Sequence, residues 1–268
     1  MDLILSPFRA LGRSLVELLN YLGELGLLAL EILQAAFRSR PRLGLFIFQV
    51  VEIGWRSQIV IVVTGAFTGA VLAAQALFQF KQLGLANGGG ALVSVAMLRE
   101  LGPTITALML AGRIGSGMAA EIGTMKVTEQ IDALRSMAVQ PIDYLVVPRV
   151  LAIAVCVPLL TAESALCGIS ASYLVGVEAF NIPAAYWNTH VEQFTTLSDL
   201  TVALIKGSTF GFLIVLISCH QGLSAHNGAV GVGQGTTRAM VYSALSILIA
   251  NFFLTLLLNQ IFPVGLNN

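Results

Sequence analysis

Two long stretches without a charged side chain constrain this chain most. Residues 57–80 and 239–262 are largely apolar and contain no Asp, Glu, Lys or Arg. About 20 apolar residues in a helix cross the ~30 Å hydrocarbon core of a bilayer. Only 10% of the 268 residues are charged, whereas soluble proteins have about 25%. The chain is therefore predicted to fold in a membrane.

Three further apolar segments complete a set of five predicted spans. They cover approximately residues 91–123, 144–177 and 200–219. The first helix could begin near Leu43, because Glu52 and Arg56 are spaced to pair on one helix face. Gly65 and Gly69 are also four residues apart, a spacing that lets two helices approach closely.

The segments between the spans have different compositions. Residues 84–90 predict a turn, and the glycine-rich residues 222–237 predict a loop. Residues 178–199 predict a polar connector, with Tyr186 and Trp187 as aromatic anchors at the membrane surface. In the third span, the sequence predicts kinks at Pro148 and Pro158.

Residues 8–37 predict an amphipathic helix. Their polar side chains recur at spacings of three, four and seven, at Arg13, Glu17, Asn20, Glu24, Glu31 and Gln34. One charged stripe on an apolar helix is typical of a helix in the plane of the membrane surface. A helix packed on the protein's own bundle is the alternative. The run Arg38, Arg40, Pro41 and Arg42 is predicted to end it.

The positions of Lys and Arg predict the orientation. Six arginines precede the first span: Arg9, Arg13, Arg38, Arg40, Arg42 and Arg56. The link at residues 124–143 lies close to four more basic residues, whereas the connector 178–199 has none. Positively charged loops stay in the cytoplasm, so the N-terminus, this link and loop 220–238 are predicted to be cytoplasmic. Five spans then place the C-terminus outside.

Several kinds of site find no support in the sequence. It contains no G-x-x-x-x-G-K-[ST] phosphate loop, so any ATP hydrolysis is expected from a partner. The three cysteines are far apart in apolar runs and the histidines fall in connectors or span ends, so no metal site is predicted. No basic tract suggests nucleic acid, and no removable signal peptide is evident.

Arg99 and Glu100 are a charged pair inside the second span, followed by Gly102 and Pro103. Charges at such depth are costly and usually face a cavity or a partner. Adjacent residues diverge by about 100° on a helix, so serving one face requires a local distortion. Two interpretations remain open: an arginine that receives an anion, or a structural pair that ties helices together. Glu163 and Lys206 lie midway in later spans and could partner each other or this pair.

Residues 126–137 predict a short two-faced helix in the cytoplasmic link. Pro141 stops it. A helix there could dock into a partner and transmit its motion to the two attached spans. A plain solvated connector is the alternative. The side chains of interest are Lys126, Glu129, Ile131, Asp132, Leu134 and Arg135.

Four separated motifs resemble the MlaE/YrbE family, the permease subunits of ABC transporters that work with MCE-domain proteins. They are LRELGP (98–103), AGRIGSGMAAEIGTMKVTEQIDAL (111–134), PR (148–149) and GVGQGTTRAMV (231–241). The resemblance covers residues 43–263. It implies an all-α integral membrane protein with an N-terminal interfacial (elbow) helix at residues 1–42. A five-span permease domain at residues 43–268 follows, with a cytoplasmic coupling helix between its second and third spans.

The resemblance also implies partners and a substrate. Family permeases form homodimers, and each binds a separate ATPase that holds ATP and Mg²⁺; residues 126–137 would contact it. An MCE hexamer sits over the dimer, and a STAS-domain protein can bind the ATPase. The substrate is a lipid, usually a glycerophospholipid. Arg99 and Glu100 map onto the lipid site, with Leu72, Leu77 and Phe78 as acyl-chain contacts. The location implied is the bacterial inner membrane, with a plastid inner envelope as alternative.

Two other function classes fit the sequence less well. One is an autonomous secondary transporter with a charge relay through Arg99, Glu100, Glu163 and Lys206. Such folds often show inverted repeats, and the sequence shows none. The other is a membrane scaffold that binds partners and transports nothing.

Overall fold

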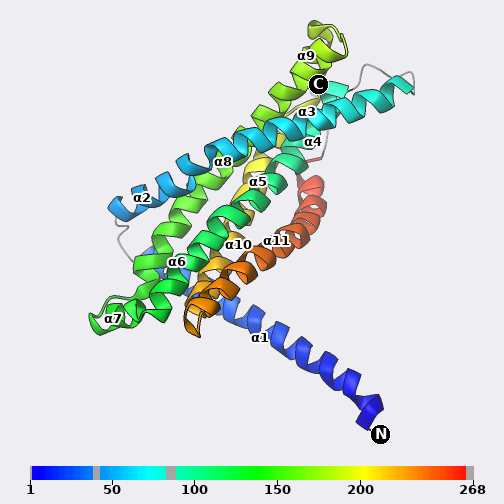
Figure 1. Ribbon diagram of the computed structural model, residues 1–268. Helices are drawn as coiled ribbons and strands as arrows, with labels where there is room; N and C mark the ends of the chain where they lie inside the picture. Colours follow the sequence, from blue (N-terminus) through cyan, green and yellow to red (C-terminus); the bar gives the residue numbers. More distant parts are fainter. Residues whose placement is uncertain (1, 39–42, 83–88, 264–268) are drawn as a thin grey trace.

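The computed structural model describes residues 2–38, 43–82 and 89–263, and every secondary-structure element in these ranges is helical (Figure 1). The α-helices are α1 (Asp2–Arg38), α2 (Leu43–Ile53), α3 (Gln58–Gln82), α4 (Gly89–Ala96), α5 (Gly102–Leu110), α6 (Ser116–Val127), α7 (Gln130–Ser136), α8 (Val147–Leu174), α9 (Ala184–Phe194), α10 (Leu197–Leu223) and α11 (Gly228–Ile261). A 3₁₀ turn, η1 (Trp55–Ser57), joins α2 to α3, and four π-helical turns are η2 (Met97–Leu101), η3 (Ala111–Gly115), η4 (Ile142–Val146) and η5 (Val175–Ala179). The predicted all-α fold is confirmed.

Five helical segments among the described residues are long and apolar enough to cross a membrane. They are Leu43–Gln82, Gly89–Val127, Ile142–Ala179, Leu197–Leu223 and Gly228–Ile261. The predicted number of spans is confirmed, and each helical segment is longer than its predicted range. Helix α8 continues through Pro158, and Pro148 lies in its first turn, directly after η4.

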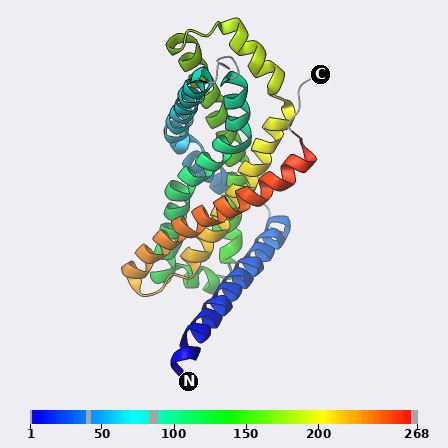
Figure 2. The same cartoon turned by 90° about the vertical axis from the view of Figure 1, so that its right-hand side faces the viewer.

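The connections gather at opposite ends of the bundle. The α7 link and the α10–α11 turn lie at one end, and α9 lies at the other (Figure 1). Helix α1 joins the α7 end and projects from it (Figure 2). The three segments predicted to be cytoplasmic therefore share one end, as alternating spans require.

Helices α3 and α8 pack closely because small residues face each other. A Cβ on Gly65 would lie 2.6 Å from the carbonyl oxygen of Ser164, and one on Gly69 would lie 2.1 Å from that of Gly168. Only glycine allows such an approach, so the close contact predicted for Gly65 and Gly69 is confirmed. This contact fixes α3 on the bundle, while much of its other face is exposed.

Helix α1 has features of both predicted arrangements of residues 8–37, a helix at the membrane surface and a helix packed on the bundle. Its second half packs on the bundle through buried residues at helical spacing, Leu25, Leu28, Ile32 and Ala35. Nearer its start, large apolar side chains are exposed, including Leu15, Leu19 and Leu22. The described helix ends at Arg38, and the predicted stop at residues 40–42 lies outside the described residues.

The prediction of a loop over residues 222–237 was wrong. Helix α11 begins at Gly228, so the fifth span is longer than residues 239–262. One of these glycines permits a close approach: a Cβ on Gly231 would overlap the carbonyl oxygen of His226 at 1.4 Å, whereas Gly228 and Gly233 have open space around them. Composition suggested a loop, but glycine propensity is a weak predictor of structure and the chain here is helical.

The connector at residues 178–199 contains a helix, α9, and its tryptophan is not a surface anchor. Trp187 is 2% exposed and packs in a small apolar cluster with Leu77 and Met97. A Cβ on Gly176 would lie 2.3 Å from its ring, so glycine makes room for the indole. Of the turn predicted at residues 84–90, residues 84–88 lie outside the described residues, and Gly89 and Gly90 begin α4.

Candidate functional site: an intramembrane charge cluster

Arg99 and Glu100 lie in a π-helical turn, η2. In η2 the N–H of Gly102 bonds to the carbonyl oxygen of Met97, five residues earlier. A Cβ on Gly102 would lie 2.5 Å from that oxygen, so glycine permits the wide turn. Pro103 has no N–H to donate to the helix. The predicted distortion is therefore present, and it lies immediately before the Gly-Pro pair.

Arg99 ties together the start of α10 and the end of α11. Arg99 is 4% exposed, and its guanidinium donates from Nε to the Asp199 carboxylate. Nη1 donates to Asn259 Oδ1 at 2.8 Å and to the Phe262 carbonyl at 2.9 Å. Asp199 also accepts the backbone N–H of Thr196 at 2.7 Å and so caps α10. These contacts give Arg99 a structural role in joining helices.

Glu100 faces a second set of partners. Lys206 Nζ lies 2.9 Å from its carboxylate and also donates to the Arg99 carbonyl at 2.7 Å. Thr255 Oγ1 accepts from Lys206 at 2.8 Å and donates to Glu100 at 3.0 Å. Asn251 Nδ2 donates to the same carboxylate at 3.2 Å. Because Lys206 is fully buried and the Glu100 side chain is 38% exposed, the carboxylate is the accessible side of the pair.

The pairings predicted for Glu163 and Lys206 are confirmed in part. Lys206 partners Glu100, whereas Glu163 accepts from Gln58 Nε2 at 3.2 Å and does not pair with Lys206. Sequence reasoning missed Asp199 and three polar residues of α11. Asp199 completes a Thr-x-x-Asp capping box, a recognisable helix start. Asn251, Thr255 and Asn259 recur every four residues, which places them on one helix face.

The three predicted acyl-chain contacts lie along two hollows of the α3 surface. Leu72 lines a hollow of about 450 Å³ together with Leu101, the residue after Glu100. Leu77 and Phe78 line another hollow of about 470 Å³ beside Phe180. Phe78 is exposed and meets the Phe180 ring edge-on, whereas Leu77 is 2% exposed and belongs mainly to the core. The Leu72 hollow is therefore the one whose lining includes a residue of the η2 turn that carries Arg99 and Glu100.

The coupling-helix residues divide between two helices. The short helix α7 begins at Gln130, not at Lys126, because the chain turns sharply at Glu129 with φ of 61°. Lys126 belongs to the end of α6 and reaches Asp132 at 3.5 Å. Ile131 is fully buried and anchors α7 to the bundle, and Leu134 is half-buried.

The polar face of α7 lies at the surface. Glu129, Asp132 and Arg135 are exposed. Arg135 also pairs with Asp132 at 3.4 Å. The short helix, at the end of the bundle (Figure 1), therefore has two acidic side chains and one basic side chain at its surface, while Ile131 packs into the hydrophobic core.

Comparison with known proteins decides the family. The family model described as "Permease MlaE" matches residues 46–257. The chain belongs to the MlaE permease family. A probable ABC transporter permease protein of Rickettsia typhi is 36% identical over 97% of this chain and 100% of its own length. One from Synechocystis is 40% identical over 88% of each chain.

A third relative is chloroplastic. The protein TRIGALACTOSYLDIACYLGLYCEROL 1 of Arabidopsis thaliana is 37% identical over 86% of this chain and 65% of its own length. Together these relatives identify this MlaE-family chain as a multi-pass permease subunit of an ABC transporter, which implies a partner ATPase. The resemblance found in the four motifs is confirmed.

Proposed function

We propose that this permease moves lipids, with glycerophospholipids as the main class, between the membrane and an MCE-protein channel. The observation that carries the proposal is the partly exposed Glu100 carboxylate in the same helical turn as Leu101, which lines an apolar hollow with Leu72. A charged group beside an apolar surface suits an amphipathic ligand, because the headgroup and the acyl chains each find a matching surface. The chloroplastic relative, which carries the name of a galactolipid, supports a lipid substrate.

In this proposal Glu100 contacts the headgroup, and Arg99 mainly holds the surrounding helices in place. Arg99 already engages Asp199, Asn259 and the Phe262 carbonyl. It fixes the ends of α10 and α11 around Glu100. Its Nη2 is buried without a partner among the described residues, which leaves one donor for a ligand phosphate.

The chain works as a homodimer in this account, and a separate ATPase binds ATP and Mg²⁺. Glu129, Asp132 and Arg135 contact the ATPase, and the buried Ile131 passes its motion to α6 and α8. An MCE hexamer receives or delivers the lipid on the opposite side, and a STAS-domain protein binds the ATPase. The membrane is the bacterial inner membrane, with the N-terminus in the cytoplasm and the C-terminus outside.

The test is ATP-dependent transfer of a fluorescent phospholipid in proteoliposomes that contain the permease, its ATPase and its MCE protein. Glu100→Gln is expected to abolish most transfer. Glu163→Gln is the matched control, since it neutralises another half-buried carboxylate within a span. If Glu100→Gln leaves Lys206 uncompensated and the chain unfolds, the double variant with Lys206→Met removes both charges. Normal transfer by a folded variant that lacks the Glu100 carboxylate contradicts the proposal.

A further inference from the structure

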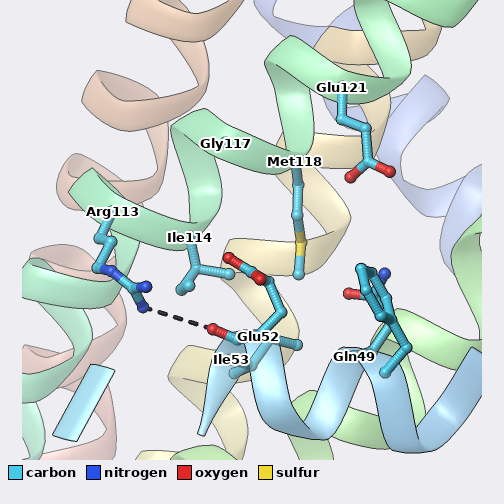
Figure 3. A pocket seen from close by; sticks show the side chains of 9 residues that line it. Gln49, Glu52, Ile53, Arg113, Ile114, Gly117, Met118 and Glu121 are labelled. Carbon is cyan, nitrogen blue, oxygen red and sulfur yellow. Dashed lines mark hydrogen bonds between the residues drawn. The ribbon is translucent and has the colours of Figure 1, made fainter. Parts of the chain in front are cut away.

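A separate polar cavity lies between α2 and the η3–α6 segment. Its volume is about 220 Å³, and Figure 3 shows side chains from both elements pointing into it. Pockets that enclose a drug-sized ligand have about 300–1,000 Å³. This cavity can therefore take a small polar group while the rest of a larger ligand stays outside. It is lined by residues other than those of the two hollows along α3.

The cavity carries charges of both signs. Glu52 from α2 and Glu121 from α6 direct carboxylates toward it, and Arg113 lies at one edge (Figure 3). Each carboxylate also has an arginine partner: Arg56 pairs with Glu52, and Arg149 pairs with Glu121 at 2.7 Å. Such an arrangement suits a group that itself has both charges.

Gln49 gives an independent indication of a ligand. Its side chain is 9% exposed and points into the cavity (Figure 3). Within the described part of the chain, its carboxamide has no hydrogen bond. Its amide oxygen and nitrogen are not among the fully buried polar atoms without a partner, so they are accessible from the cavity. A polar ligand group in the cavity can therefore hydrogen-bond to them.

The residues around the cavity suit the depth at which lipid headgroups lie. Trp55, which is 74% exposed, and Arg56 separate α2 from the charge-free part of the first span. Tryptophan and arginine are enriched at the membrane–water interface, so we place this interface near the start of the charge-free run, within the segment Leu43–Gln82. Next to the cavity, the apolar side chains of Ile47 and Phe48 are exposed, at 58% and 61%. A ligand here can place its polar part inside and its apolar part along α2.

We propose that this cavity binds the headgroup of a zwitterionic phospholipid that carries a primary amine. The ammonium group has three N–H donors, which match the carboxylates of Glu52 and Glu121 and the amide oxygen of Gln49. The lipid phosphate binds Arg113. This inference rests on the proposed function and deepens it. It gives the permease a second lipid site, in the leaflet at the α7 end, and names the headgroup class.

The test is native mass spectrometry of the full-length protein titrated with phosphatidylethanolamine or phosphatidylglycerol. The wild type is expected to bind phosphatidylethanolamine more tightly. Glu52→Gln and Gln49→Leu should each weaken that binding about tenfold or more, because each removes a hydrogen bond to a charged group. Binding of phosphatidylglycerol should not change. Glu17→Gln, an equal change on an exposed part of α1, is the matched control.

Three results would overturn this inference. The two lipids could bind equally to the wild type, or both variants could keep full affinity while folded. The variants could also dissociate a dimer without losing lipid, in which case a second copy of the chain covers the cavity. The outcome is separate from that of the transfer assay. Lipid transfer by a chain without headgroup preference refutes only this inference, whereas headgroup preference without transfer refutes only the proposed function.

Discussion

Replacing Asp199 by Asn should destabilise the protein strongly, because it leaves the Arg99 charge buried without a carboxylate. The Arg99 and Asp199 side chains are 5% and 2% exposed. Asparagine keeps an oxygen that can cap the Thr196 N–H, so the substitution removes mainly the charge. The guanidinium then retains only Asn259 and the Phe262 carbonyl.

The expected magnitude follows from the burial of this pair. Breaking a buried ion pair by removing one partner costs about 3–5 kcal/mol. At 1.4 kcal/mol per factor of ten, the unfolding equilibrium constant rises roughly 10²- to 10⁴-fold. Removing both charges, with Arg99→Met and Asp199→Asn together, should cost less than Asp199→Asn alone, since no uncompensated charge is left. The coupling energy between two such contacting residues reaches about 3 kcal/mol.

The assay is equilibrium unfolding in mixed detergent micelles, followed by circular dichroism for the wild type, both single variants and the double variant. Arg135→Met is the control, because the exposed Arg135–Asp132 pair should contribute about 1 kcal/mol or less. Additive effects of the two substitutions, or a cost for Asp199→Asn no larger than the control, would refute the reasoning.

Three further outcomes are expected. Gly69→Ala should lower the unfolding midpoint, because its Cβ would lie 2.1 Å from an α8 carbonyl oxygen, whereas Gly233→Ala, with open space around it, should not. Replacing both Glu129 and Asp132 by Lys should abolish co-purification of the ATPase without changing the stability of the permease. If the ATPase still co-purifies, these two residues do not contact it. Burial raises the pKa of Tyr21 when α1 is docked, so the Tyr21 hydroxyl loses its proton at a lower pH when α1 is released. Docking of α1 should therefore weaken above about pH 10. Proteolysis of α1 as a function of pH measures this, and a rate that does not change with pH contradicts it.

Much of the fold could be predicted because lipid leaves few choices. A charge-free run such as residues 57–80 has to be a helix there, since each backbone group must be paired within the segment. The failures lie where packing decides. The glycines at residues 228–235 look like a loop by propensity, yet the described chain there is helical. Trp187 has the composition of a surface anchor, but glycines from distant segments make a buried place for it.

The candidate site was predicted in part. Buried charge inside an apolar run identified Arg99, Glu100 and Lys206, since such residues are rare unless paired. The pairing itself depends on contacts across about 100 residues of sequence, as between Arg99 and Asp199. Adjacent residues of a helix point in different directions, and no local pattern specifies which helix each of the two charges meets.

The most direct measurement of the central claim is photocrosslinking with a phospholipid that carries a diazirine in its acyl chain. The permease complex would be illuminated in nanodiscs, and the labelled peptides identified by mass spectrometry. The account predicts labelling at Leu72 and Leu101, competed by unlabelled phospholipid and lost in the folded Glu100→Gln variant. Labelling confined to the exposed outer face of α11, or unchanged in that variant, would contradict a lipid site at the charge cluster.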